Sequence, residues 1–434
     1  MADPSVPPRR QLQSQETTQS LESPGVVHLP QGVMTILVLF LFLRLTILFL
    51  YTPQGLLNSF TDYDFYYRTA QLSDQGYYPY VNMWYEYPPF LAYLPQLAYE
   101  ITRVILPSTL FEAFGFNFFS RVLGSILLLF DAGVLILLYR LGDQVWGKAA
   151  AHWVSWVYLS LSLPMFFWSY SHQVVPVFFL LLAMDLFLSK RYTTSAIALG
   201  SGIAAKLTPI LFLVVVLKFL WPNWKRIILY GLTSIGVFVV FFLPFWLMGG
   251  SEWIVASFKA WANVGSWRTV WALIDGNWGP GYYGPLETRL QIQEAVAAQA
   301  NPAVVPGWVS LAVFGLLVVW YMRKPGRGTA GANLVWFTTI ITLLFLLWSK
   351  GWSPQWAVML IPLLLLSFPG KLGLVFVLGL SGLTFLEWPL LEILESQVLF
   401  AIHIVIRTGF FVYILYVLTR RLWSADALIL VRQA

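Results

Sequence analysis

The chain has 434 residues, of which 58% are hydrophobic, 17% aromatic and 11% charged, and its mean hydropathy is +0.71. Soluble domains carry roughly a quarter charged residues, so the composition excludes a soluble one-domain or two-domain enzyme. The formal net charge is +6, but the basic residues lie in short clusters between apolar runs, and we expect no nucleic-acid partner. The absence of cysteine excludes disulfides, thiol catalysis and cysteine-based zinc sites.

Apolar runs long enough to cross a bilayer recur along the chain, since a helical span needs about 20 residues. The runs are continuous, whereas the strands of a membrane β-barrel alternate apolar and polar residues. The sequence therefore predicts an all-α polytopic membrane protein. Residues 1–31 are polar, and we expect them to form a disordered cytosolic tail. The predicted transmembrane domain covers 32–423, with its first span over 33–51, and 424–434 form a second cytosolic tail.

Basic residues set the predicted orientation, because lysine and arginine concentrate in cytoplasmic loops. The clusters of basic residues that set this orientation are Arg140 and Lys148, Lys190 and Arg191, Lys218 to Arg226, Arg323 to Arg327, Lys371, and Arg420 and Arg421. If all of these clusters lie on the cytosolic side, the apolar runs between two successive clusters must cross the membrane in pairs, out and back. The result is a bundle of about 12 spans with both termini cytosolic. The lack of an Asn-x-Ser/Thr sequon favours the plasma (inner) membrane of a bacterium.

Two segments depart from this regular pattern. Arg191 and Lys218 lie 27 positions apart, too few for two full spans at about 1.5 Å per residue. This spacing predicts two short helices that meet near 206–209, where Pro209 cannot continue a regular helix. The apolar run over 88–106 is expected as a helix on or partly in the membrane, because a full crossing there would put the next basic cluster outside.

The polar residues that the orientation rule does not use fall on the extracytoplasmic side of this layout. They lie in a long first loop over 52–117, which also carries amphipathic helices, and in a second long loop over 249–302. Others lie in turns around 350–355 and 387–395. Twelve interleaved segments could have scattered them, so their convergence predicts an extracytoplasmic active site.

The first loop holds Asp62 and Asp64 within an aromatic run over 61–89. Two carboxylates can divide two tasks, one taking a proton from an attacking hydroxyl and the other orienting a substrate or a metal. Tyrosine and tryptophan rings suit sugars, whose C–H faces stack on rings while their hydroxyls bond to carboxylates. Two other interpretations stay open: the acids cap a short helix, and the rings form an aromatic belt at the membrane interface.

Further along the chain, Lys206 and the segment 352–355 are suited to hold an anion. Lys206 lies near membrane depth, where a cation needs a partner or a water-filled cavity, and a lipid-linked phosphate would be such a partner. Snorkelling of the side chain to the interface is the alternative. Ser353 and Pro354 can start a helix whose free N–H groups face an anion. A capped helix start without a ligand is the alternative there.

The last predicted span carries His403 and Arg407, which are four positions apart and share a helix face. The two side chains could hold a phosphate, or Arg407 could pair with an internal acid such as Asp131 or Glu387. His172 has no second histidine at ligand spacing, so we expect no histidine metal site. The chain has no Walker motif and no Gly-x-Ser-x-Gly, so P-loop nucleotide binding and serine hydrolysis have no support.

In the order and spacing of these motifs the chain resembles the GT-C glycosyltransferases, membrane enzymes that use polyprenyl-phosphate sugars. It is similar to glycosyltransferase family 87, the bacterial α-mannosyltransferases, and to the first mannosyltransferase of GPI-anchor assembly. The motifs that carry the resemblance are Thr61-Asp62-Tyr63-Asp64, Gly76, Pro79-Tyr80, Tyr87-Pro88-Pro89, Gln173, Lys206-x-x-Pro209 and Ser353-Pro354-Gln355. No C-terminal soluble domain of the oligosaccharyltransferase kind is expected.

This resemblance implies transfer of a hexose, in the first place mannose, from a polyprenyl-phosphate donor to a glycolipid or glycan acceptor, with inversion. Asp62 is then the general base and Asp64 binds the acceptor or orients the base, although the sequence leaves open which of them is the base. The expected phosphate-binding residues are Lys206, Lys350, His403 and Arg407. The expected substrate contacts are Tyr66, Tyr80, Trp84, Glu86, Tyr87, His172, Gln173, Trp352, Ser353 and Gln355. Since the phosphate already leaves readily, no metal or other cofactor is expected.

A polyprenyl-linked lipid flippase or transporter is the alternative function, with the charged residues lining a passage. Transporters usually show internal repeats and charges near mid-membrane, whereas this chain shows no clear repeat and carries its acids in a loop. The choice of sugar, the acceptor and the linkage cannot be read from the residues. The oligomeric state is also open, and a monomer is compatible with the sequence.

Overall fold

The computed structural model describes residues 31–51, 61–161, 172–279, 281, 283–297 and 300–423. The described residues form helices and two isolated β-bridges, with no strand among them. The two tails predicted at the ends of the chain lie outside this part, apart from the residue at which α1 (Gln31–Leu50) begins. Residues 52–60 of the predicted first loop lie outside it as well.

Within the described residues, five helices are long and apolar enough to cross a membrane, and four shorter apolar helices accompany them. The long ones are α1, α4 (Ser108–Trp146), α15 (Ala330–Trp348), α17 (Lys371–Phe385) with its continuation to Leu394, and α19 (Gln397–Trp423). The shorter ones are α7 (Val174–Leu188), α9 (Phe212–Leu220) with the turn before it, α14 (Gly307–Arg323) and α16 (Ala357–Ser367) with the turn before it. This is the all-α membrane architecture that the sequence predicts, but these helices do not confirm a count of about 12 spans.

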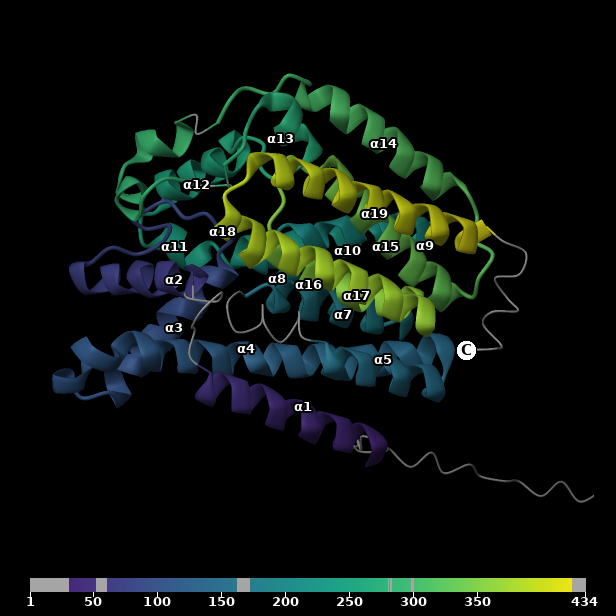
Figure 1. The fold of residues 1–434 in the computed structure, drawn as a ribbon, viewed down its shortest axis with the longest axis horizontal. Helices are drawn as coiled ribbons and strands as arrows, with labels where there is room; N and C mark the ends of the chain where they lie inside the picture. The colour runs from purple at the N-terminus through teal and green to yellow at the C-terminus, as the bar shows by residue number, and fades with distance from the viewer. Residues whose placement is uncertain are drawn as a thin grey trace, which may run out of the picture.

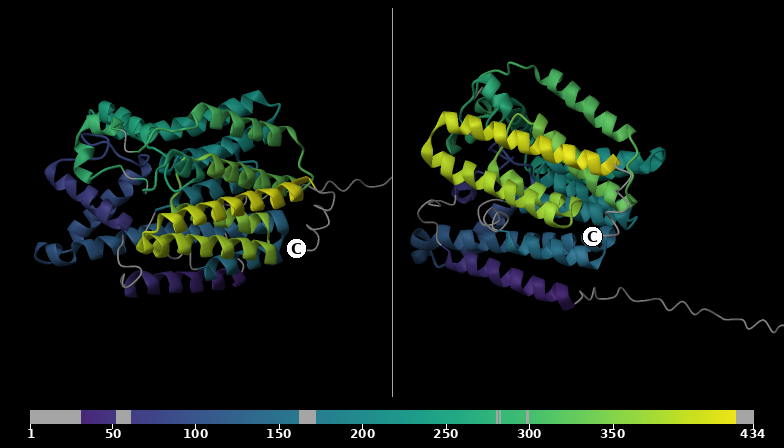
Figure 2. Two further views of the ribbon diagram at one scale, coloured as in Figure 1. Left: turned by 45° about the horizontal axis from the view of Figure 1, so that its top comes forward. Right: turned by 45° about the vertical axis from the view of Figure 1, so that its right-hand side comes forward.

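The long helices lie roughly side by side along the longest axis of the molecule (Figure 1). Short helices gather at one end, where α2 (Thr61–Gln71), α11 (Leu243–Leu247), α12 (Ser251–Asn263) and α13 (Val270–Asp275) are found. The rotated views in Figure 2 keep the same separation. We call this the loop end of the molecule; it consists of the described residues within 61–89, 249–304, 349–356 and 386–396.

The centre of the bundle is apolar on all sides. Every residue of α16 is buried, and α15 is buried over most of its length. A helix that is hydrophobic all round belongs in a core. By contrast, α1 and α19 expose large apolar side chains such as Phe42 and Val398. A face of this kind is suited to lipid, so α1 and α19 lie at the periphery of the bundle.

Helix α4 is the longest element, with 39 residues. At 1.5 Å per residue it extends about 58 Å, roughly twice the 30 Å hydrocarbon core of a bilayer. The helix begins at Ser108, directly after Pro107, and no later proline interrupts it. Residues 108–117, which the sequence predicts as the end of the first loop, are therefore the first turns of α4. Along its length α4 contacts α1, α5 (Lys148–Ser160) and α7, and α3 (Phe90–Ile105) joins it to α2.

The broken helix predicted near 206–209 is confirmed. Helix α8 (Tyr192–Ala205) ends where Lys206 adopts an extended backbone, with φ −158° and ψ 145°. A single 3₁₀ turn (Thr208–Leu211) with Pro209 near its start then leads into α9. Proline has no N–H to give to a regular helix, so the chain bends here and the half-buried Lys206 lies at the junction.

Candidate functional site

The two carboxylates of the first loop lie on opposite faces of α2. Residues two apart on a helix differ by about 200° in direction, so Asp62 and Asp64 cannot face the same point. Asp64 has an exposed side chain (53%) and forms an ion pair with Arg68 at 2.9 Å. Asp62 is half-buried and faces the other loop-end segments. The two acids therefore have different surroundings. This corrects the expectation that both carboxylates act in one site.

Asp62 receives a hydrogen bond from Nε2 of Gln355 at 3.2 Å. Burial, with a smaller contribution from the charge of Glu86, raises the pKa of the Asp62 carboxyl to about 7, although Lys206 and the Tyr66 hydroxyl act in the opposite direction. A general base works best when its pKa lies near the working pH. Asp62 has this property, which an exposed carboxyl on a loop would not have.

Lys206 is held by neutral groups. Its Nζ donates to Oε1 of Gln173 at 2.7 Å and lies 4.3 Å from the ring centroid of Trp356. Burial lowers the pKa of Lys206 to about 7, and the nearby Asp62 charge opposes that shift. An ammonium held by an amide oxygen and a ring face keeps most of its charge unneutralised, so it is suited to attract an anionic group.

The ring of His172 packs against those of Tyr66 and Tyr87, with centroids 4.7 Å apart in each case. His172 is buried, and its Nε2 has no hydrogen-bond partner among the described residues. Burial, assisted by the charge of Lys206, lowers the pKa of this imidazole well below its usual range, so the ring is neutral. Tyr87 keeps part of its surface exposed. These aromatic rings form one wall beside the carboxylate.

Tyr80 and Trp84, predicted from the sequence as substrate contacts, lie in the interior of the loop end. Tyr80 is 0% exposed, and its hydroxyl donates to the backbone oxygen of Tyr87. Trp84 is 1% exposed, and its Nε1 donates to the backbone oxygens of Thr288 and Gln291, both at 3.1 Å. Their contacts are with the protein itself, so in this structure both residues hold the first loop in place.

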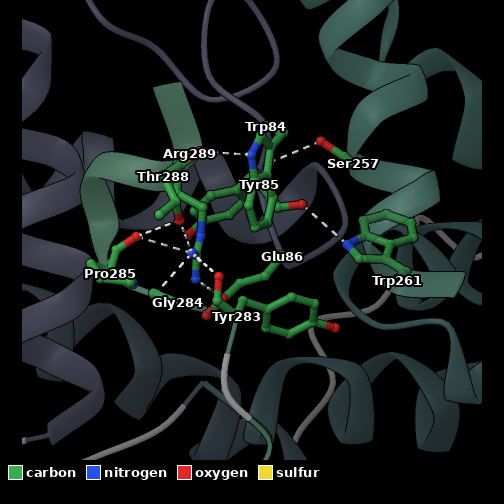
Figure 3. A network of polar contacts seen from close by, with 10 residues as sticks. All are labelled: Trp84, Tyr85, Glu86, Ser257, Trp261, Tyr283, Gly284, Pro285, Thr288 and Arg289. Atoms are coloured by element: carbon green, nitrogen blue, oxygen red, sulfur yellow. Dashed lines mark hydrogen bonds and ion pairs between the residues drawn. The ribbon is translucent and has the colours of Figure 1, made fainter. Parts of the chain in front are cut away.

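Glu86 forms an ion pair with Arg289 at 2.7 Å, and Figure 3 shows the network around it. Arg289 lies in a short 3₁₀ helix (Leu286–Leu290) of the second loop and is 2% exposed. Sequence reasoning did not select it. The available signal was its position, since an arginine outside the basic clusters and among acidic and aromatic residues is unusual for an extracytoplasmic loop.

Three residues predicted to bind donor or substrate share one buried carboxylate instead. Oε2 of Glu387 lies 3.0 Å from Nε1 of Trp352 and 3.2 Å from Nε2 of His403, and it accepts a bond from Arg407. Arg407 also donates to the backbone oxygen of Arg268. The internal pair of Arg407 with Glu387, one of the two alternatives from the sequence, is what the structure shows. The physical reason is that a buried carboxylate requires a cation and donors.

Lys350 and Ser353 occupy the turn between α15 and α16. The backbone oxygen of Lys350 accepts from Thr269 Oγ1 at 2.9 Å. In the described part of the chain, no hydrogen bond or ion pair is formed by its ammonium group. Ser353 precedes the short turn (Pro354–Trp356) but makes no side-chain cap. Within the described residues neither side chain forms a hydrogen bond or ion pair with Asp62, and their predicted roles stay predictions.

The described residues contain no group of three or more His, Asp or Glu side chains that could hold a metal ion. Asp62 and Asp64 face different directions, so this pair does not form a chelating site in the described structure. The independence from metal that the sequence predicts remains a prediction.

No family model and no curated protein matches the chain. Among solved structures, it is similar to the oligosaccharyltransferase of Archaeoglobus fulgidus in the apo form, with a TM-score of 0.44 and 13% identity, over 89% of this chain and 55% of that one. For the complex of that protein with Zn and sulfate the TM-score is 0.37 at 13% identity, over 88% of this chain and 52% of that one. The chain thus spans about half the length of these structures. A likeness at these scores does not establish a shared activity.

Proposed function

We propose that the protein is an integral-membrane glycosyltransferase that moves a hexose from a polyprenyl-phosphate donor to a hydroxyl of a glycolipid or glycan. The single observation that carries the proposal is the Asp62 carboxyl, half-buried at the loop end, with a pKa raised to about 7 and the Lys206 ammonium nearby. A proton acceptor and a cation beside one another suit the two charge changes of such a transfer.

In the proposed reaction the acceptor hydroxyl gives its proton to Asp62 while its oxygen forms a bond to the anomeric carbon of the sugar. The bond from that carbon to the phosphate oxygen breaks, and the polyprenyl phosphate leaves with the electron pair. Lys206 stabilises the negative charge that grows on this phosphate. Attack and departure on opposite sides of the carbon invert its configuration, and neither step calls for a metal or other cofactor.

Gln355 and the aromatic wall support the same proposal. The Gln355 amide donates to Oδ2 of Asp62 and so orients the carboxylate. The partly exposed Tyr87 ring beside it provides a face on which a sugar can stack. Mannose is the proposed sugar on the resemblance of the motifs to family 87. The loop end is proposed to face the extracytoplasmic side of a plasma membrane, with both termini cytosolic.

The proposal is tested by mass spectrometry of products after incubation of the purified protein with synthetic polyprenyl-phosphate hexoses and a membrane glycolipid extract. Asp62→Asn should lower transfer by about 100-fold or more, the usual contribution of a general base. Asp64→Asn, on the same helix but on the exposed face, should have a much smaller effect. Full transfer by Asp62→Asn would remove the base from the proposal. Lipid translocation without any product would favour a flippase.

A further inference from the structure

Arg289 is buried in the second loop and gathers several acceptors. Its Nη1 donates to the backbone oxygens of Gly284 and Pro285, at 3.0 and 3.2 Å. Its Nη2 donates to Oε2 of Glu86 at 2.7 Å, and its guanidinium carbon lies 4.3 Å from the ring centroid of Trp84 (Figure 3). One side chain thus joins a turn of its own loop to a segment 203 positions away.

The segment that Arg289 holds is also fixed by backbone contacts. Trp84 N donates to the Arg289 oxygen at 3.1 Å. Tyr85 N donates to Ser257 Oγ at 2.8 Å, and Trp261 Nε1 donates to the Tyr85 oxygen at 3.1 Å. The second loop and α12 therefore clamp residues 84–86 from two sides. Glu86 is the last residue of this clamped segment, and its carboxylate pairs with Arg289.

Glu86 is 13% exposed, and its negative charge acts on Asp62. Burial raises the pKa of Glu86, while Arg289 acts against that shift. Two like charges near one another hold back the ionisation of both. Arg289 thus contacts Glu86, a described acid whose charge opposes the ionisation of the proposed base.

We propose that Arg289 is a positioning residue of the site: it holds the 84–86 segment in place and offsets the Glu86 charge that acts on Asp62. The inference rests on the proposed function of Asp62 as the base. The other groups that act on Asp62 are Lys206 from the break after α8 and Tyr66 of its own helix. Around Glu86 they are Arg289, Tyr85, Tyr87 and Tyr283.

The test measures how the reactivity of the Asp62 and Glu86 carboxyls depends on pH, and it does not require the protein to transfer a sugar. Full-length protein in detergent is treated with a water-soluble carbodiimide and an amine across a range of pH, and modification of each acid is read by peptide mass spectrometry. Asp64, exposed on the same peptide as Asp62, is the internal reference. In Arg289→Gln the curves of Asp62 and Glu86 should together move to higher pH by about one unit, since a nearby cation is lost.

Two further variants complete the design. In Glu86→Gln the Asp62 curve should move to lower pH, and in the double variant Glu86→Gln with Arg289→Gln it should stay at or below its wild-type position. Glu86→Gln keeps the proposal testable if Arg289→Gln does not fold. An Asp62 curve that moves in neither single variant, or a movement of Glu86 alone, would reduce Arg289 to a structural residue and overturn the inference.

A second readout separates this inference from the proposed function. The acidic limb of the pH–rate profile for transfer should move with the Asp62 labelling curve in each variant. A protein that transfers no sugar but shows the labelling shifts would disprove the transferase and keep the electrostatic link. Transfer whose acidic limb does not follow the labelling would keep the transferase and disprove the role of Arg289.

Discussion

Gln355 donates a hydrogen bond to Asp62 at 3.2 Å although 293 positions separate the two residues. The next residue, Trp356, has its ring under the Lys206 ammonium, 4.3 Å from the ring centroid to Nζ. Two consecutive side chains of one turn therefore contact the proposed base and the proposed phosphate-binding cation. This turn sets how far apart the two charged groups can lie, and the following predictions depend on that arrangement.

Lys206→Met should raise the donor KM by roughly ten- to a hundredfold with a smaller change in kcat, because a charge-assisted bond to phosphate contributes about 1.5–3 kcal/mol. Lys218→Met is the matched control. Lys218 also contacts a ring, at 4.5 Å from the centroid of Phe337, and donates to the backbone oxygen of Lys324. It lies in the last turn of α9, a helix that Figure 1 shows away from the loop end. Steady-state kinetics against donor concentration measure both. An equal rise in KM in the two variants would disprove a specific phosphate contact.

The pH dependence of kcat/KM should be bell-shaped with its maximum near pH 7. Asp62 must be ionised, and its pKa of about 7 makes the rate fall as the pH decreases below that value. Lys206 must be charged, and its pKa of about 7 makes the rate fall as the pH increases above it. Initial rates measured over about two pH units on each side of pH 7 cover both limbs and test this. Lys206→Met should lose the alkaline limb, and its persistence there would assign that limb to another group.

Glu387→Gln should lower the free energy of unfolding by about 3–5 kcal/mol, because it leaves the buried Arg407 cation without its partner. Glu392→Gln is the control, since its carboxylate is 41% exposed and pairs with Arg268, and such pairs contribute about 0–1 kcal/mol. Denaturant unfolding in mild detergent compares the two. Similar stabilities of both variants would mean that the Glu387 cluster contributes little and that Arg407 is free for another role.

Transfer should persist in excess EDTA, because Asp62 and Asp64 face different directions and the proposed reaction uses no metal. The assay compares treated and untreated protein, with Mg²⁺ and Mn²⁺ added back. Loss of transfer on chelation with recovery on adding Mn²⁺ would overturn the metal-free mechanism.

The loop end should face the outside of the cell. Because the chain contains no cysteine, single substitutions report on one position each. A membrane-impermeant maleimide added to intact cells should label Glu287→Cys and leave Arg323→Cys unlabelled until the cells are opened; both positions are exposed in the structure. The reverse labelling pattern would invert the proposed orientation.

The sequence by itself determined the class of the protein and the position of the helix break. A continuous apolar run is stable in lipid as a helix, because every backbone N–H and C=O group then forms its hydrogen bond within the same segment. Pro209 ends the helix locally through its missing N–H, whatever surrounds it. These features depend on composition and on neighbours in the chain, so they could be predicted without tertiary structure.

Only the tertiary structure decided which polar residues meet. Asp62 and Asp64 look equivalent in the sequence, yet the helical period turns one inward and the other to solvent. The spacing of His403 and Arg407 suits a phosphate site, yet in the folded protein both side chains contact the Glu387 carboxylate. Arg289 carried no motif and gained its importance from a contact with Glu86. Contacts between distant segments follow from how helices pack, and a linear pattern does not contain that information.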